Sequence, residues 1–322
     1  MKAVVLAGGY ATRLWPITRH RPKMFLPIGD RVVIDRVFEG LEVDDRIDEV
    51  FVSTNERFEG DFEAHLAKRE FSKPTLSVEE TTDEDEKLGV IGALAQLIDR
   101  EEIEDDLLVI AGDNLISFEI AEFLDFFEKQ SSTCLAAYDV GSVDRAQHYG
   151  VLELAGDRVV DFEEKPDTPA STLVSIACYA FPADELQALR EYLEQDHNPD
   201  EPGWFIAWLH QHRPVHAFTF DEAWFDIGTP ESYLDAVRWY LGGENEIADN
   251  ATVRDSVIGE NVVVMDGAEV IGSHVSESVI FGDSTIQSCE LRECIIDENT
   301  AIQGIDLSGA LIGAHTQISN GQ

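Results

Sequence analysis

Short apolar segments bounded by glycine, proline or charged residues recur along the first 240 positions. They cover residues 3–7, 49–53, 75–78, 106–111, 134–140 and 175–181. Between several of them, apolar residues have the spacing of helices, over 33–41, 58–68, 91–99 and 120–129. This alternation predicts an α/β fold with a Rossmann-like, mostly parallel open sheet and ligands at the carboxyl ends of the strands. We therefore expect Gly8 and Gly9 to lie beside Gly112 and Asp113 at neighbouring strand ends.

The pattern changes from about residue 247, where short aliphatic pairs followed by glycine or aspartate recur. They occupy residues 257–259, 270–272, 280–282, 295–297 and 311–313. Such repeats resemble the hexapeptide left-handed β-helix, whose coils need neighbours to bury their apolar faces. The alternative is a few edge strands of an ordinary sheet. We predict two domains, residues 1–242 and 247–322, joined by a glycine-rich, acidic linker.

The charge of the chain is strongly unbalanced. Its 322 residues include 64 acidic and 23 basic side chains, a net charge of -41. Like charge opposes the compact state, whereas near-molar salt shortens the Debye length to about 3 Å. We interpret the acidity as an adaptation to a salt-rich cytosol, such as that of a halophilic archaeon. An ordinary acidic protein is the alternative. We expect neither nucleic acid nor membranes as partners of this surface.

Cysteine usage and hydropathy indicate a cytoplasmic protein. Cys134, Cys178, Cys289 and Cys294 lack the spacing of a metal site, so we expect reduced, buried thiols. Cys289 and Cys294 are also close enough in sequence to meet across a turn. No apolar segment has the length of a membrane span, and the N-terminal residues do not have the pattern of an export signal.

The first apolar segment ends in a polar loop that favours phosphate binding. Gly8 and Gly9 let backbone N–H groups approach an anion, while Arg13 and Lys23 supply two cations. The alternative is that both cations are solvated loop residues. The loop has neither the G-x-G-x-x-G pattern of dinucleotide-binding folds nor that of a P-loop.

This loop belongs to a longer pattern, L-A-G-G-x-x-T-R-L-x-P-x-T-x-x-x-P-K, which runs from Leu6 to Lys23. The pattern resembles that of the sugar nucleotidyltransferase family, which includes glucose-1-phosphate thymidylyl- and uridylyltransferases. Five further segments resemble that family in the same order: residues 87–94 (L-G-T-A-x-A-L), 111–114 (G-D), 148–151 (Y-G-V), 162–166 (E-K-P) and 224–230 (W-x-D-x-G-T-P). The resemblance covers residues 1 to about 240.

The resemblance implies a reaction and a role for each matching residue. The reaction joins a nucleoside triphosphate to a sugar 1-phosphate and releases pyrophosphate. Lys165 would hold the sugar phosphate, Arg13 the β- and γ-phosphates, and Lys23 the oxygens nearest the transfer. The implied nucleotide-binding residues are Leu6, Gly8, Gly9, Thr12, Glu79, Gly89 and Asp113, and the sugar-binding residues are Asn114, Gly150, Glu164 and Ser175. Mg²⁺ would bind to Asp113 and Asp226, because it prefers carboxylate and phosphate oxygens.

Both of these aspartates also have purely structural interpretations. Asp113 follows a strand and is a candidate helix N-cap. Asp226 is a candidate cap for a helix over 230–239.

The chain departs from the family pattern at several positions. Ala11 replaces a loop glycine, which is tolerable if its φ is negative but stiffens the loop. Ser175 and Ala177 stand where asparagine and glycine are usual, and Glu79 stands where a glutamine often meets the base, ahead of an acidic insert at 83–86. Base and sugar are therefore weakly determined.

Our leading hypothesis is transfer from UTP or dTTP to glucose 1-phosphate by a homo-oligomeric enzyme. One alternative is a bifunctional enzyme whose β-helix, some four coils long, acetylates a sugar. Another is a regulatory subunit that binds nucleotide sugars without catalysis.

Overall fold

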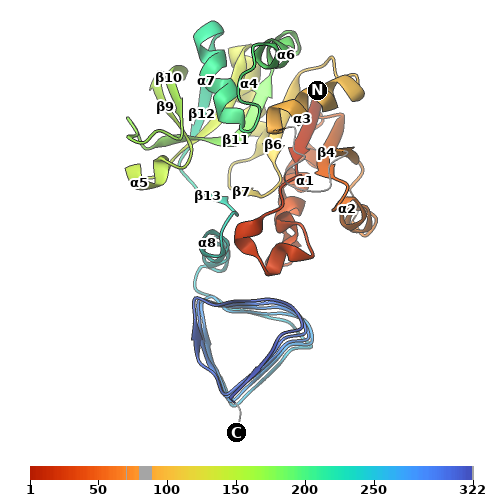
Figure 1. The fold of residues 1–322 in the computed structure, drawn as a ribbon, viewed down its shortest axis with the longest axis vertical. Coiled ribbons are helices and arrows are strands. Elements are labelled where there is room, and N and C mark those ends of the chain that lie inside the picture. The colour runs from red at the N-terminus through yellow and green to blue at the C-terminus, as the bar shows by residue number, and fades with distance from the viewer. Residues whose placement is uncertain (70, 80–88, 321–322) are drawn as a thin grey trace. The chain divides into compact units, whose positions relative to one another are not determined.

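The computed structural model describes residues 1–69, 71–79 and 89–320. By their internal contacts these residues form two compact units (Figure 1). The first holds residues 1–8 and 35–224, and the second holds 9–34 and 225–322. The boundary expected from composition, between 242 and 247, stays a prediction. The acidic insert at 83–86, with Lys87 and Leu88, lies outside the described residues.

The first unit is built on one mixed sheet, which has nine strands among the described residues, in the order β5-β4-β1-β6-β11-β8-β12-β10-β9. Four strands at one side are mutually parallel. β11 is antiparallel to both of its neighbours β6 and β8, and β10 is antiparallel to β9 and β12. The strands are β1 (Lys2–Leu6), β4 (Glu49–Asn55), β5 (Pro74–Glu79), β6 (Leu107–Ala111), β8 (Thr133–Asp139), β9 (Gly150–Ala155), β10 (Arg158–Glu164), β11 (Leu173–Phe181) and β12 (Val215–Phe220).

The predicted α/β sheet is confirmed, and all six predicted strands are present. The expectation of a mostly parallel sheet holds for β5, β4, β1 and β6. In the rest of the sheet β8 and β12 are parallel, whereas the other pairs are antiparallel. The second half contains β9, β10 and β12, which the sequence pattern did not indicate.

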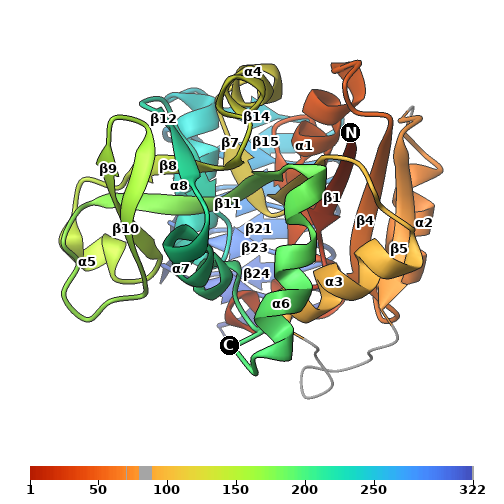
Figure 2. The same ribbon diagram turned by 90° about the horizontal axis from the view of Figure 1, so that it is seen from above.

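Helices cover both faces of this sheet, as Figure 2 shows, with α3, α6 and α7 together on one face. Leu97, Tyr192 and Phe205 from these three helices pack against Val109 and Tyr179 of the sheet in one buried core. The four predicted helices are present. The α-helices are α1 (Val33–Val43), α2 (Glu59–Leu66), α3 (Val90–Arg100), α4 (Ile120–Gln130), α5 (Val143–Ala146), α6 (Gln187–Glu194), α7 (Pro202–His212) and, in the second unit, α8 (Pro230–Leu241).

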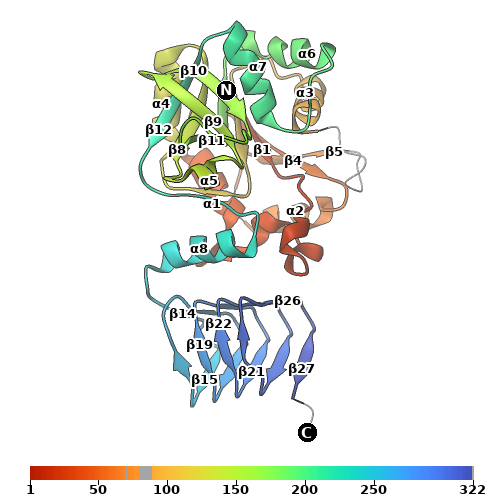
Figure 3. The same ribbon diagram turned by 60° about the vertical axis from the view of Figure 1, so that its left-hand side comes forward.

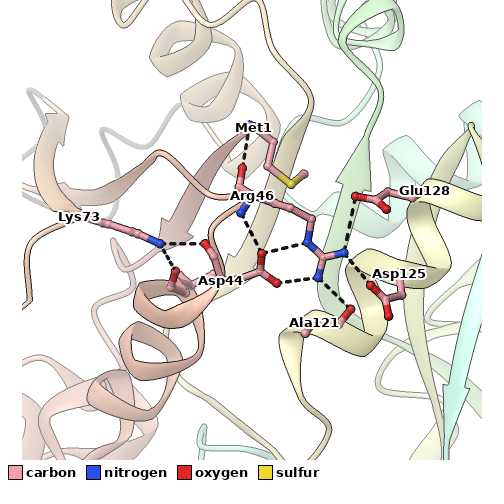
Figure 4. Close-up of polar contacts among 8 residues, drawn as sticks. Met1, Asp44, Arg46, Lys73, Ala121, Asp125 and Glu128 are labelled. Atoms are coloured by element: carbon pink, nitrogen blue, oxygen red, sulfur yellow. Dashed lines mark hydrogen bonds and ion pairs between the residues drawn. The ribbon is translucent and has the colours of Figure 1, made fainter.

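A single arginine fastens the loop before β4 to α4 (Figure 4). Arg46 Nη2 lies 2.6 Å from Asp44 Oδ2, and its Nη1 lies 2.7 Å from Asp125 Oδ1 on α4. Hydrogen bonds from Arg46 hold the pKa of Asp44 below its ordinary value. Lys73 donates to the carbonyl oxygens of Leu41 and Asp44 at 3.0 and 2.8 Å. These cations hold the end of the sheet opposite to the carboxyl ends of β1 and β4.

The second unit contains a parallel β-helix of triangular cross-section, seen end-on in Figure 1 and from the side in Figure 3. Among the described residues, three parallel ladders hold five, five and four strands. The strands are β14 (Glu246–Ile247), β15 (Thr252–Arg254), β16 (Val257–Ile258), β17 (Val263–Val264), β18 (Glu269–Ile271), β19 (His274–Ser276), β20 (Val279–Ile280), β21 (Thr285–Gln287), β22 (Glu290–Arg292), β23 (Ile295–Ile296), β24 (Ala301–Gln303), β25 (Leu307–Ser308), β26 (Leu311–Ile312) and β27 (Gln317–Ser319).

Aliphatic residues stack in register through this β-helix. Val264, Ile280 and Ile296 pair directly on successive coils and are essentially inaccessible to solvent. The alternative of a few edge strands of an ordinary sheet is wrong. Among the described residues the ladders of five, five and four strands make nearly five coils, where some four were expected.

All four cysteines are free and buried, as predicted. Cys289 and Cys294 occupy positions that serines hold one coil earlier. The Cys289 N–H donates to Ser273 Oγ at 3.1 Å, and the Cys294 N–H donates to Ser278 Oγ at 3.0 Å. Their own thiols contact carbonyl oxygens of the next coil. Both cysteines therefore belong to ladders of small polar side chains at the corners of the β-helix.

Among the described residues, no helix combines the length and apolar character that crossing a membrane requires.

Candidate functional site

The carboxyl ends of β1 and β6 meet at the predicted place. Leu6 pairs with Ala111, and the Gly112 N–H donates to the Leu6 carbonyl at 2.9 Å. Gly8 and Asp113 each stand two residues after this pair. The expectation that Gly8 and Gly112 follow neighbouring strand ends is confirmed.

Polar side chains from β4 and β5 surround Gly8. Asn55 Nδ2 donates to the Gly8 carbonyl at 2.8 Å, and Ser53 Oγ donates to Glu79 Oε1 at 3.1 Å. A Cβ atom at Gly8 would lie 3.8 Å from Glu79 Oε1, so this carboxylate reaches the glycine backbone. Asn55 is buried, and its Oδ1 has no hydrogen-bond partner within the described residues. The sequence analysis named Glu79 but missed Asn55. The feature that could have identified Asn55 is its place as the polar last residue of the largely apolar strand β4.

Gly89 is the N-cap of α3 and has φ 76°, a conformation that favours glycine. A Cβ atom there would lie 2.4 Å from the Pro199 carbonyl oxygen. That same oxygen accepts the Ile91 N–H at 2.9 Å, so the loop that contains Pro199 satisfies a free backbone N–H in the first turn of α3. Both the backbone angle and the close approach therefore require glycine.

Asp113 lies in the turn between β6 and β7 (Asn114–Ile116), where its neighbour orients it. Asn114 Nδ2 donates to Asp113 Oδ1 at 3.0 Å, and Asn114 Oδ1 accepts from Trp224 Nε1 at 2.5 Å. The helix that follows, α4, has Glu119 as its N-cap. The alternative role of Asp113 as a helix cap is therefore wrong. Trp224 is the partner that sequence reasoning missed.

The predicted sugar-binding residues Gly150, Glu164 and Ser175 come together on β9, β10 and β11. Gly150 pairs with both Glu164 and Ser175 in the sheet. A Cβ atom at position 150 would lie 2.4 Å from Phe162 Cζ and 2.7 Å from Glu164 Oε2. Glycine at position 150 thus makes room for the Glu164 carboxyl. Ser175 Oγ donates to the Tyr179 hydroxyl at 3.4 Å.

Glu164 belongs to a cluster of three ionisable side chains. Lys165 Nζ forms an ion pair with Glu201, the residue before α7, and Glu201 is hydrogen-bonded to Glu164. A Cβ atom at Gly203 would overlap the Glu164 carboxyl, so this helix position also needs glycine. Sequence reasoning found Glu164 and Lys165 but missed Glu201 and Gly203, because these two lie at the start of α7, some 40 residues further along the chain.

Glu164 is 8 % exposed. Its burial, followed by its hydrogen bond to Glu201 and the charge of Glu201, raises the pKa of Glu164 to about 8. Burial also acts on Glu201, but hydrogen bonds from Lys165 and Glu164 outweigh it and keep the pKa of Glu201 below its ordinary value. The raised pKa of Glu164 and the lowered pKa of Glu201 make Glu164 the favoured site for a proton shared by the pair.

The second unit holds the predicted cations. Arg13 lies in a short 3₁₀ helix (Thr12–Leu14). A Cβ atom at Gly228 would lie 2.9 Å from Arg13 Nη2 and 3.8 Å from Asp226 Oδ1, so the guanidinium and this carboxylate flank the same glycine. A Cβ atom at Gly9 would likewise lie 3.9 Å from Lys23 Cε. Arg13 and Lys23 thus each lie against a glycine backbone.

Two expectations about this unit need correction. Ala11 has φ 50°, not the negative value that its tolerance required, and Thr18 Oγ1 fixes its carbonyl at 2.8 Å. A left-handed alanine costs about 1 kcal/mol. Asp226 does not cap α8, because Thr229 is the N-cap and forms a capping box with Ser232.

Asp113 and Asp226 belong to different units, so their common metal site stays a prediction. Within the described residues, no three or more His, Cys, Asp or Glu side chains form a group that could hold a metal ion by themselves. The arrangement supplies cations and glycine backbone for phosphate groups, and carboxyl and hydroxyl groups for a polyol.

Comparison with known proteins agrees with this chemistry. The profile of the nucleotidyl transferase family matches residues 2–242, and that of the GlmU-like C-terminal hexapeptide matches residues 240–318. The second match confirms the predicted left-handed hexapeptide β-helix.

Curated relatives carry several specificities. A protein of Sulfolobus acidocaldarius assigned as a mannose-1-phosphate guanyltransferase is 27 % identical over 85 % of this chain and 75 % of its own length. The glucose-1-phosphate thymidylyltransferase of Streptomyces griseus is 25 % identical over 99 % of this chain and 94 % of its own length. The bifunctional protein GlmU of Methanocaldococcus jannaschii is 24 % identical over 83 % of this chain, but over only 61 % of its own length.

The fold also matches a solved structure. A crystal structure assigned as a glucose-1-phosphate thymidylyltransferase of Bacillus anthracis, in complex with sucrose, superposes with a TM-score of 0.63. It is 24 % identical and covers 73 % of this chain and 93 % of its own.

Proposed function

The chain belongs to the nucleotidyl transferase family, and we propose that it transfers a nucleotidyl group from a nucleoside triphosphate to a hexose 1-phosphate. The observation that carries this proposal is the cluster around Glu164. A largely buried carboxyl lies between two glycines and beside Lys165, which suits a polyol that carries a phosphate. Arg13 and Lys23, which each lie against a glycine backbone, suit the phosphates of the second substrate, the nucleoside triphosphate.

The proposed reaction is an in-line displacement. A phosphate oxygen of the sugar 1-phosphate forms a bond to the α-phosphorus, and the bond to the pyrophosphate oxygen breaks. The attacking oxygen is ionised at neutral pH, so the reaction needs no general base. The protein therefore has to align two polyanions and neutralise the charge on departing pyrophosphate. Lys23 and Arg13 would serve the triphosphate, and Lys165 the sugar phosphate.

The ion pair between Lys165 and Glu201 has a role in this scheme. Lys165 is about half-exposed and has φ 48°, and its N–H donates to the Tyr149 carbonyl at 3.0 Å. Its backbone is therefore fixed while its ammonium group is held by an accessible carboxylate. An arriving phosphate would replace Glu201 at Lys165. Protonated Glu164 and Ser175 would then hydrogen-bond the sugar hydroxyls.

The donor set also suits a divalent metal. Asp113, oriented by Asn114, and Asp226, beside Arg13, are the carboxylates that would hold Mg²⁺. Mg²⁺ commonly takes one or two carboxylates and completes its coordination with substrate phosphates and water. When bound, it would neutralise charge on the phosphate groups.

The base and the sugar are left to experiment. UTP or dTTP with glucose 1-phosphate is the first combination to test, and the name of the Sulfolobus relative adds GTP with mannose 1-phosphate. Acetyl transfer by the β-helix is a weaker candidate. Its two histidines, His274 and His315, are both exposed, so neither lies in an enclosed site that would orient a general base for acyl transfer.

The deciding experiment incubates the purified protein in about 2 M KCl with Mg²⁺, each triphosphate and a panel of sugar 1-phosphates. Pyrophosphate and the nucleotide sugar are both quantified. Lys165→Ala is the inactive control, and Lys129→Ala, on the exposed end of α4, is the matched control. Tight binding of a nucleotide sugar without pyrophosphate release would instead support the regulatory subunit. We also propose a cytoplasmic homo-oligomer, whose subunit number light scattering would give.

A further inference from the structure

The segment that carries Arg13 and Lys23 is packed on the β-helix. By internal contacts, residues 9–34 group with residues 225–322 rather than with the sheet. The cations of the proposed triphosphate site therefore belong to the same compact unit as the C-terminal coils.

One corner of the β-helix provides the contacts. Phe281, Asp297 and Gly313 follow β20, β23 and β26 and are stacked 16 residues apart on three successive coils. The Phe281 N–H donates to the Ile296 carbonyl at 2.9 Å, and the Asp297 N–H donates to the Ile312 carbonyl at the same distance. Parallel pairing thus fixes these three residues relative to one another.

Arg21 binds two of the three. Its Nη2 lies 2.7 Å from Asp297 Oδ1, and its guanidinium carbon lies 5.0 Å from the centre of the Phe281 ring. The Asp297 side chain is 3 % exposed and that of Arg21 is 19 % exposed. Asp297 Oδ1 also accepts the Glu298 N–H at 2.9 Å. Arg21 Nη2 also lies 3.4 Å from Oε1 of the half-exposed Glu298. Arg21 therefore has two carboxylate partners, of which Asp297 is shielded from water, and a buried aromatic face.

The third corner residue contacts the same loop at a second point. A Cβ atom at Gly313 would lie 2.7 Å from Pro16 Cβ, so glycine lets the proline ring rest on the coil. Pro16 is three residues after Arg13, and Arg21 is two residues before Lys23. The loop is thus held at two points, and each point adjoins one of the two cations.

We propose that Arg21 is a positioning residue and that the β-helix, through Asp297, sets the geometry of the triphosphate loop. The β-helix would then contribute to the rate of nucleotidyl transfer and not only to assembly. This inference rests on the proposed function. A loop shifted by a fraction of an ångström would misplace Arg13 and Lys23, whereas the sugar subsite around Glu164 belongs to the other unit.

The main variant is Asp297→Asn, which keeps the shape and the acceptor for the Glu298 N–H. It removes the nearer and buried charge of the two that Arg21 pairs with, and leaves the half-exposed Glu298 carboxylate at 3.4 Å. Glu293→Gln is the matched control. Glu293 lies in the same coil and pairs with Arg238 of α8 at 3.3 Å, not with the loop. Kinetics with both substrates are measured in about 2 M KCl, and melting is followed by circular dichroism.

We expect Asp297→Asn to lower kcat by about 10-fold or more and to raise the KM for the triphosphate. The KM for the sugar 1-phosphate should change by less than about 2-fold, and Glu293→Gln should resemble the wild type in all three constants. Arg21→Lys should recover part of the rate. The double variant Arg21→Gln/Asp297→Asn should lose no more activity than the more impaired of the two single variants, because both substitutions break the same contact.

Wild-type kinetics in Asp297→Asn, or equal losses in Glu293→Gln, would overturn the proposal. So would additive losses in the double variant, or equal effects on both substrates. Should Asp297→Asn fail to fold, Phe281→Leu keeps an apolar side chain and removes the aromatic face. Phe281→Leu should then also lower kcat and raise the KM for the triphosphate, by smaller factors than those expected for Asp297→Asn. Unchanged kinetics would refute the inference. An inactive wild type would instead refute the proposed function.

Discussion

The shared proton of Glu164 and Glu201 makes the stability of the folded chain depend on pH in a predictable direction. The pKa of Glu164 is raised from 4.5 to about 8, chiefly by burial and then by Glu201. The folded state therefore binds this proton more tightly than the unfolded state does. The resulting stabilisation is complete below the unfolded value and is lost as the pH rises through the folded value.

The size of the effect follows from the shift. At about 1.36 kcal/mol per pKa unit, the upper limit is about 5 kcal/mol. Lys165 lies beside the pair and would stabilise the ionised form, and Glu201 can rotate away because it is more exposed. We therefore expect a loss of about 2 kcal/mol between about pH 6 and pH 9.

Glu164→Gln is the perturbation that isolates this proton. A carboxamide keeps the shape of the protonated acid and can still donate to Glu201, but it does not titrate. Urea unfolding in about 2 M KCl would be measured at several pH values for the wild type and the variant. The neighbouring Glu163→Gln, which changes an exposed residue of β10, controls for the loss of one formal charge.

The wild type should lose about 2 kcal/mol more than Glu164→Gln over this pH range, and Glu163→Gln should follow the wild type. Parallel curves for the wild type and Glu164→Gln would show that Glu164 ionises normally. The account of a protonated acid in the sugar subsite would then be refuted.

Four shorter predictions concern the loop, the metal and salt. Lys23→Ala and Lys165→Ala should each lower turnover by about 100-fold or more, and Lys165→Ala should mainly impair use of the sugar phosphate. Initial rates over a grid of both substrates check this, and near wild-type kinetics in both variants would contradict the roles. Asp113→Asn and Asp226→Asn should each abolish Mg²⁺-dependent product formation with unchanged circular dichroism, whereas wild-type activity that survives EDTA would exclude the metal role. Ala11→Gly should raise the free energy of unfolding by up to about 1 kcal/mol, because glycine adopts φ 50° without steric cost. Urea titration measures this change, and destabilisation would show that the strain is absent. Lowering KCl below about 0.5 M should unfold the protein or separate its subunits, and a melting temperature that is flat from about 0.1 M to 3 M would disprove the salt adaptation.

The elements that could be predicted are those whose signal is local. β1 and β6 are continuous apolar segments that end in glycine, and the coils of the β-helix repeat small local motifs. β10 escaped prediction for a physical reason. Its register shifts between Val159 and Asp161, so buried and exposed residues do not alternate regularly.

The candidate site divides in the same way. Glycine and charged residues within short motifs, such as Gly150 and Glu164, were identifiable from their neighbours in sequence. Glu201 and Gly203 were not, because their importance comes from packing against Glu164, which is distant in sequence. The φ of Ala11 also depends on tertiary structure, since Thr18 holds its carbonyl in place.

The net charge of -41 constrains how such a protein can bind phosphates at all. Both proposed substrates are anions, so at about 0.1 M salt the protein's field would repel them over a Debye length of about 10 Å. At molar salt that length falls to about 3 Å, and only side chains in direct contact with the ligand still act. Phosphate recognition must then rest on contacts such as those expected of Arg13, Lys23 and Lys165. Salt weakens most complexes between proteins and polyanions because it screens attraction. In this chain salt chiefly screens the repulsion between the acidic protein and its anionic substrates. Arg13, Lys23 and Lys165 would therefore bind phosphates at molar salt through direct contact, although long-range electrostatic attraction is screened there.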